Sequence, residues 1–188
     1  MNKGLIVALF WLIIASALQA QENQSENVKQ RVASNSNNLR VIQLDDGALG
    51  NAFAIHLNDQ LVMKTGGEEH QSGFRFHAFP FPDVILHITA ELPPFQEVFV
   101  VQQRMWGNAC DGGPIWFLGV KADGTFSVSD PVDYCGGPPP IFTVTSEKVT
   151  ITDQGHAPNR GAGFIPEDVW VYQDGKVNQR QQPKRRKK

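Results

Sequence analysis

The strongest constraint on the fold is a rhythm of short apolar or alternating segments, each bounded by Gly, Pro, Asn or Asp. Such segments are typical of β-strands, and no stretch after residue 20 keeps a helical period long enough for a stable helix. Asn58-Asp59 and Asp174-Gly175 also carry the chemistry of tight hairpin turns. The pattern predicts strands over residues 40–44, 52–57, 60–64, 84–90, 96–104, 115–121, 125–129, 141–145, 148–152, 169–173 and 176–179.

Two of these segments differ in how they are expected to be covered. Residues 115–120 are apolar on both faces, so this strand needs cover on both sides. Residues 84–90 place Val84, Leu86 and Ile88 on one face, which predicts one core face and one partly wet face. We therefore predict an all-β fold: a single antiparallel β-sandwich or irregular β-barrel with one disulfide and little helix.

The chain begins like an exported protein. Lys3 precedes an apolar run over residues 5–14, and small residues follow as far as Ala20. This order is that of a secretory signal peptide, and cleavage after Ala17 or after Ala20 fits it. The run is shorter than the roughly 20 apolar residues that span a bilayer, so we expect no transmembrane segment after cleavage and a secreted or periplasmic protein.

Residues 21–38 are dominated by Gln, Asn, Ser and charged side chains. Their few apolar side chains cannot offset the entropy lost on ordering, so we expect a flexible leader, with a short helix over residues 26–33 as the alternative. The predicted division of the chain is a signal peptide at 1–20, a polar leader at 21–38, a β domain at 39–179 and a disordered basic tail at 180–188.

Cys110 and Cys135 are the only cysteines. In an oxidising compartment we expect one disulfide between them, with two reduced thiols as the alternative. Runs of Gly and Pro follow both cysteines, at residues 112–114 and 136–140, so the bridge ties together two irregular connections. The pair lacks the Cys-x-x-Cys spacing of redox sites, which favours a structural role.

The net charge of −2 hides an asymmetry. Residues 21–173 carry −9, whereas residues 174–188 carry +6. A basic tail attracts an anionic surface or polymer, and a purely solubilising role is the alternative. Because no aromatic residues are interleaved with the cations, we predict no sequence-specific binding of nucleic acid. The basic residues are Lys184, Arg185, Arg186, Lys187 and Lys188.

The sequence predicts no catalytic residue, metal site or cofactor. The five histidines form no compact ligand motif, and no Gly-x-Ser-x-Gly element occurs. We expect His56 and His87 to be ordinary, partly buried strand residues. A hydrolase of an envelope polymer that uses His70, His77 and nearby acids such as Glu68 and Glu69 remains an alternative.

A cluster of aromatic residues is the main candidate for binding. Its rings offer large contact areas at low entropic cost if they are exposed, although they could instead cap one end of the core. The cluster consists of Phe74, Arg75, Phe76, His77, Phe79 and Phe81. We predict a non-enzymatic domain that binds another macromolecule, either a protein or an envelope polymer, in the manner of an inhibitor, an immunity protein or an assembly factor. The second alternative to this function is a surface protein that binds polyanions through the tail.

Overall fold

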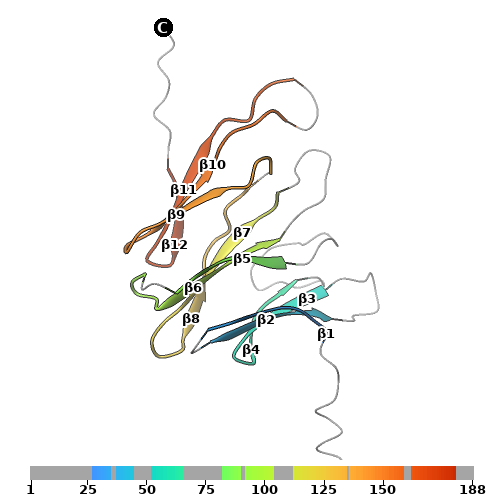
Figure 1. Cartoon of the computed structure of the whole chain (residues 1–188), viewed down its shortest axis with the longest axis vertical. Helices are drawn as coiled ribbons and strands as arrows, with labels where there is room; N and C mark the ends of the chain where they lie inside the picture. The colour runs from blue at the N-terminus through green and yellow to red at the C-terminus, as the bar shows by residue number, and fades with distance from the viewer. Residues whose placement is uncertain are drawn as a thin grey trace, which may run out of the picture.

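The computed structural model describes residues 27–34, 37–44, 52–65, 82–89, 92–103, 112–134, 136–158 and 162–180. Within these ranges the chain forms strands and no helix, so the all-β prediction is confirmed (Figure 1). Accordingly, no helix in these ranges is long and apolar enough to cross a bilayer. The strands are β1 (Asn27–Ala33), β2 (Asn38–Leu44), β3 (Ala52–Leu57), β4 (Gln60–Thr65), β5 (Pro82–Ile88), β6 (Glu97–Gln103), β7 (Ile115–Val120), β8 (Phe126–Val128), β9 (Ile141–Val144), β10 (Val149–Asp153), β11 (Asp168–Gln173) and β12 (Lys176–Gln179).

The strands form three antiparallel sheets of four strands each. The first sheet has the order β1-β2-β3-β4, the middle sheet β5-β6-β7-β8 and the third sheet β12-β11-β10-β9. Each sheet is therefore made of consecutive strands joined by local connections. Figure 1 shows the three sheets stacked along the long axis, with the middle sheet between the other two.

The two central strands of the middle sheet are buried on both faces. Side chains along β6 and β7 alternate between the neighbouring sheets, as the period of two in a strand requires. Val100 and Phe117 pack towards the third sheet, whereas Phe99 and Leu118 pack towards the first. The prediction that residues 115–120 form a strand covered on both sides is confirmed.

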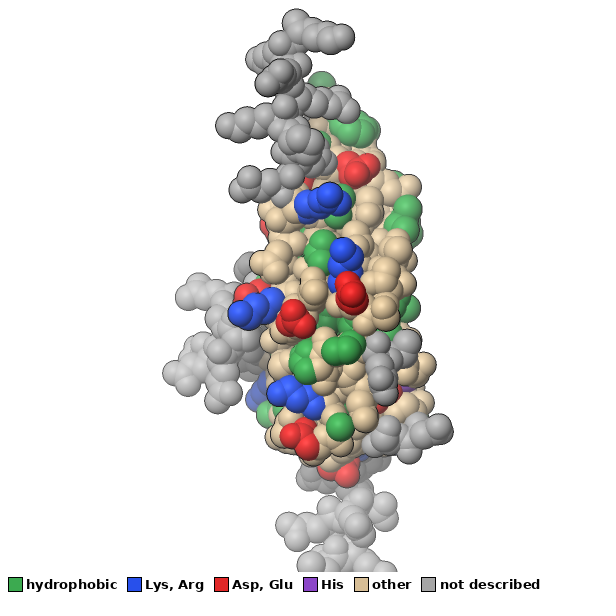
Figure 2. All heavy atoms as spheres, turned by 90° about the vertical axis from the view of Figure 1, so that its left-hand side faces the viewer, with side chains coloured by type: hydrophobic (Ala, Val, Ile, Leu, Met, Phe, Trp, Pro, Cys, Tyr) green, Lys and Arg blue, Asp and Glu red, His purple; other side chains and the backbone are tan. Residues whose placement is uncertain are grey.

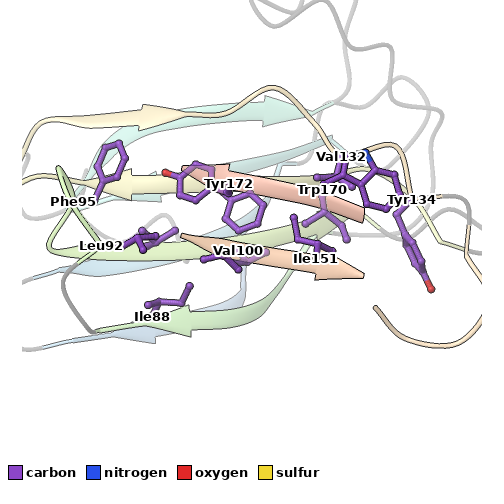
Figure 3. Packing of buried hydrophobic residues seen from close by; sticks show 13 residues of the cluster. Ile88, Leu92, Phe95, Val100, Val132, Tyr134, Ile151, Trp170 and Tyr172 are labelled. Carbon is purple, nitrogen blue, oxygen red and sulfur yellow. The ribbon is translucent and has the colours of Figure 1, made fainter. Parts of the chain in front are cut away.

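Two hydrophobic cores result, one on each side of the middle sheet. The first core joins the first and middle sheets and contains Leu39, Val41, Phe53, Ile55, Leu57, Phe99, Val101, Leu118 and Val120. The second core joins the middle and third sheets (Figure 3) and contains Ile88, Leu92, Phe95, Val98, Val100, Ile115, Phe117, Val132, Tyr134, Val149, Ile151, Trp170 and Tyr172.

Tyr172 lies at the centre of the second core and is fully buried. Its ring stacks on Phe117, with the centroids 4.3 Å apart, and lies 6.2 Å from the ring of Phe95. The buried hydroxyl has no hydrogen-bond partner among the described residues. Burial raises the pKa of Tyr172 well above the ordinary range of a phenol, because a phenolate there would lose its hydration.

Phe95 fills a space that two glycines leave open. A Cβ on Gly119 of β7 would lie 2.6 Å from Cδ1 of Phe95, closer than side-chain atoms approach one another. A Cβ on Gly175, in the turn between β11 and β12, would lie 3.1 Å from Cζ of the same ring. The ring thus packs against backbone from both the middle and the third sheets.

The first and middle sheets also meet at one edge. The side-chain amide of Gln30 in β1 donates to the carbonyl of Val84 in β5 at 3.3 Å and accepts from its N–H at 2.7 Å. Val84 lies next to a bulge in β5, which is an edge strand of the middle sheet. The amide of Gln30 bonds to both backbone groups of Val84, as a neighbouring strand would.

The structure differs from the sequence prediction at the start of the domain. Residues 27–33 were expected in a flexible leader or a short helix, but they form strand β1 paired with β2. The ladder with β2 supplies the hydrogen bonds that this polar segment cannot make alone, and Val32 packs against the first core. Asn38, the last residue of the predicted leader, is the first residue of β2. The cleavage site, residues 21–26 and 35–36 of the leader and residues 181–188 of the tail lie outside the described residues.

A second difference concerns residues 84–90. The bulge between Val84 and Leu86 inserts one extra residue, so the alternation breaks. Val84 consequently packs against the first core, while Leu86 and Ile88 join the second core. The expectation that all three share one face is wrong, because a single insertion shifts a strand's side chains to the other face.

The packing of Phe95 predicts that Gly119→Ala destabilises the fold. The new methyl group would force the ring away from Tyr172 and Gly175, at a cost of about 1–3 kcal/mol. Urea unfolding measures this difference. In a Phe95→Ala background the methyl has room, so Gly119→Ala should cost much less there. Equal costs in the two backgrounds would contradict the explanation.

The two tyrosines of the chain should respond in opposite ways to loss of the hydroxyl. Tyr172→Phe removes an unpartnered buried hydroxyl, so the free energy of unfolding should stay equal or rise by about 1 kcal/mol. Tyr134→Phe removes a 2.7 Å hydrogen bond to the carbonyl of Pro138 and should lower it by about 1 kcal/mol. Chemical denaturation of both variants provides the comparison.

The same burial predicts an alkaline dependence. The pKa of the Tyr172 hydroxyl is higher in the folded than in the unfolded chain. The free energy of unfolding therefore does not depend on this group below about pH 10, and it falls as the pH rises above that value. The Tyr172→Phe variant should lose less stability over this range. An identical alkaline loss in both proteins would contradict the assignment.

Candidate functional site

A buried polar cluster joins the first and middle sheets at the start of β6. Glu97, at the start of β6, has a side chain that is only 5% exposed. Its Oε1 lies 2.5 Å from Nε2 of His87 in β5, and its Oε2 accepts a hydrogen bond from Nδ2 of Asn37. The carboxyl group therefore has a partner on each oxygen, which is what burial of such a group requires.

The cluster continues into the first sheet through two asparagines. Asn58 Nδ2 donates to Asn37 Oδ1 at 2.8 Å, and the backbone N–H of Asn38 donates to Asn58 Oδ1 at 2.8 Å. Asn58 and Asp59 both adopt positive φ, 49° and 68°, in the hairpin turn between β3 and β4. Asparagine tolerates this conformation, so the turn that the sequence predicts also delivers an amide to the cluster.

His87 is held in two ways. Its ring lies parallel to that of Phe99, with the centroids 4.5 Å apart, and its Nε2 is engaged by Glu97. This leaves Nδ1 as the ring nitrogen open to a further partner, and the side chain is 20% exposed. A carboxylate that orients an imidazole is a component of general-base sites. Within the described residues no hydroxyl or thiol group bonds to this ring. Through Glu97, which also accepts from Asn37, the ring is part of the contact between the first and middle sheets.

A second histidine lies beside an acid in the third sheet. Nδ1 of His156 is buried and makes no hydrogen bond within the described ranges. It lies 3.8 Å from Oδ1 of Asp153, whose side chain is 5% exposed. Gly137 lies directly against the ring, so a Cβ at this position would overlap it. This close approach, together with a φ of 97°, explains why a glycine follows Gly136 in the Gly-Gly-Pro run.

Neither pair extends to a metal site. Over the described ranges, no group of three His, Cys, Asp or Glu side chains is arranged to hold a metal ion. His56 lies in β3 and is partly buried, as is His87.

Large exposed apolar side chains gather on the third sheet and its connections. Phe164 is 68% exposed, Ile141 49% and Val144 41%. Phe164 lies next to Gly155, since a Cβ added to Gly155 would be 3.1 Å from Cε1 of Phe164. Ile141 pairs with Thr152, which precedes Gly155 by three residues. We call Ile141 and Phe164 the C-terminal patch. Figure 2 shows one face of the molecule, on which hydrophobic side chains also reach the surface between charged ones.

The site residues predicted from the sequence lie outside the described residues, so their positions remain predictions. They include both cysteines of the predicted disulfide and the two histidines of the hydrolase alternative. These residues are Cys110, Cys135, His70, His77, Phe74, Arg75, Phe76, Phe79, Phe81, Lys184, Arg185, Arg186, Lys187 and Lys188.

Sequence reasoning missed the Glu97 cluster. In the sequence, the cluster is indicated only by an acidic residue, Glu97, at the start of an apolar strand. Asn37 and Glu97 are 60 residues apart and meet only because two sheets stack, so the sequence does not pair them. Comparison with known proteins gives no further guide, since no family model, curated protein or solved structure matches the chain.

The Glu97 cluster predicts that Asn37→Ala lowers stability. The substitution removes one of the two donors to a buried carboxyl group, at a cost of about 1.5–3 kcal/mol in the free energy of unfolding. Asn178→Ala is the matched control, since Asn178 is exposed in edge strand β12 and should change stability by less than about 0.5 kcal/mol. Equal losses in the two variants would argue against a linking role for Asn37.

Proposed function

We propose that this chain is an exported, non-enzymatic β module that captures another macromolecule, either a protein or an envelope polymer. Its outward route would be the predicted signal peptide, and its β-sandwich would be reinforced by a disulfide between Cys110 and Cys135. The observation that carries the proposal is the C-terminal patch, in which Phe164 is 68% exposed and Ile141 of β9 is 49% exposed.

The packing of the sheets supports a surface role. Both faces of the central strands β6 and β7 are consumed by the two cores, so the middle sheet offers no open face to a ligand. Binding must then use outer faces, strand edges or loops. Exposed aromatic side chains are strong anchors of interfaces, because they bury a large area while losing little rotamer freedom.

The predicted aromatic cluster at residues 74–81 is the second binding element in this proposal. It lies between β4 and β5, whereas the C-terminal patch belongs to the third sheet. A partner could use either element, and the basic tail at residues 184–188 would add salt-sensitive attraction to an anionic partner.

Capture from an envelope extract tests the proposal. Phe164→Ser should weaken recovery of bound material by about tenfold if Phe164 is an anchor worth more than 1.4 kcal/mol. The matched control is Leu61→Ser, which removes another exposed apolar side chain from the first sheet, far from the patch. Phe79→Ser with Phe81→Ser tests the other element in the same assay.

The outcomes separate the alternatives. Unchanged recovery with all these aromatic variants would contradict the proposal. Loss only on deletion of Lys184–Lys188, together with strong salt dependence, would instead favour a polyanion-binding protein that works through its tail. Turnover of an envelope polymer that is lost on chelation would favour a hydrolase.

A further inference from the structure

The six edge strands of the three sheets are protected unequally. Unpaired edges invite pairing with another chain, and proteins usually block them with bulges, charges, short strands or covering groups. β1 and β5 carry bulges and are bridged to each other by Gln30. β4 carries a bulge and the exposed Lys64, β8 has three residues, and β12 begins with the exposed Lys176.

Within the part of the chain that the structure describes, short length is the one such protection that β9 has. Its four residues are uncharged, its pairing with β10 is free of bulges, and Ile141 and Val144 are among the most exposed apolar side chains described. Only the prolines that precede the strand, at residues 138–140, limit how far an added strand can extend.

The direction of the free backbone groups on β9 follows from the turn that ends it. The N–H of Thr145 donates to the carbonyl of Lys148 at 2.9 Å, so these two residues form a hydrogen-bonded pair. Pairs alternate along an antiparallel ladder, and Val144–Val149 and Phe142–Ile151 are therefore the non-hydrogen-bonded pairs. The N–H and C=O groups of Phe142 and Val144 consequently point away from β10, towards the open edge.

We propose that β9 pairs with β9 of a second copy of this chain, across a twofold axis perpendicular to the sheet. The register that uses both outward-facing residues places Phe142 opposite Val144 of the partner subunit and Thr143 opposite Thr143 of the partner subunit. Each of the two Phe142–Val144 pairs exchanges two hydrogen bonds. The alternative registers centred on Phe142 or Val144 make only one such pair within the strand.

Side-chain chemistry agrees with this register. A perpendicular twofold axis keeps the faces of the two sheets aligned, so residues that meet across the axis lie on the same face. Phe142 and Val144 share the core-side face with their β10 partners Ile151 and Val149, whereas Thr143 shares the outer face with Thr150. The pairing thus joins apolar to apolar residues and threonine to threonine, both of which stabilise antiparallel pairs.

The short contact sets the strength of the dimer. Four residues from each copy bury less area than a permanent interface requires, so the dimer should be weak and dependent on concentration. This self-association does not depend on the proposed capture of another macromolecule. The pairing is centred on Thr143 and uses backbone groups of Phe142 and Val144, whereas the capture proposal rests on the side chains of the C-terminal patch.

Sedimentation of the purified chain from micromolar to millimolar concentration tests the pairing, with a monomer–dimer equilibrium as the expected result. Thr143→Lys places two like charges directly opposite each other and should weaken association by about tenfold or more. Asn178→Lys is the matched control. Asn178 lies in the row of paired residues that runs from Thr143 through Thr150 and Val171, and it is exposed at the opposite edge of the sheet. Its substitution should therefore leave association unchanged.

A charge-swap mixture supplies the positive test. Thr143→Lys and Thr143→Glu should each be monomeric alone and should form a heterodimer when mixed, because the opposite charges then meet across the axis. Phe164→Ser should leave the dimer intact, which separates this result from the capture assay. A chain that stays monomeric at millimolar concentration, a loss shared equally by Asn178→Lys, or a mixture that stays monomeric would each overturn the pairing.

Discussion

Burial of the middle sheet on both faces is the constraint on which the rest of the structure depends. A sheet with one wet face needs apolar residues only at alternate positions, but β7 and residues 98–101 of β6 are apolar at nearly every position because each face meets another sheet. Two cores then form instead of one, and each outer sheet has only a single face to bury. This division explains why β1 and β12 are rich in polar residues while still pairing with β2 and β11.

Much of the strand pattern could be predicted from the sequence, because it is written in local chemistry. The turns at Asn58-Asp59 and Asp174-Gly175 carry the positive φ values that their residue types favour, and the strands on both sides of each turn pair as hairpins. Residues 115–120 revealed their double burial directly. The strand pattern does not predict β1, because β1 is held by its ladder with β2 and by the side chain of Gln30. Neither feature appears in the sequence as an alternation of apolar residues. The bulge at Ile85 was equally hidden, since one inserted residue leaves the composition of a strand unchanged.

The polar cluster shows where sequence reasoning ends. The alternating pattern predicted a partly buried His87, but it could not predict that Glu97 would face it, because that contact depends on the register between β5 and β6 after the bulge. Asn37 reaches the carboxyl group, and Asn58 reaches Asn37, only because two hairpin turns of the first sheet lie over the start of β6. A buried carboxyl group that takes one donor from each of two sheets specifies how the sheets align, which the less directional packing of aliphatic side chains does poorly. We infer that this cluster fixes the relative position of the first and middle sheets.

The junction between the middle and third sheets is specified differently. There the contact is made by aromatic rings, with Phe95 seated against Gly119 and Gly175 and with Tyr172 stacked on Phe117. Glycine at both positions lets a large ring approach the backbone of two sheets, so shape replaces hydrogen bonding as the source of specificity. The hydroxyl of Tyr172, which has no hydrogen-bond partner among the described residues, is consistent with this arrangement. The position of the ring is set by its stacking on Phe117 and not by a bond to its hydroxyl. The two interfaces of the stack thus rely on different physics: directional hydrogen bonds align the first and middle sheets, whereas the fit of aromatic rings aligns the middle and third sheets.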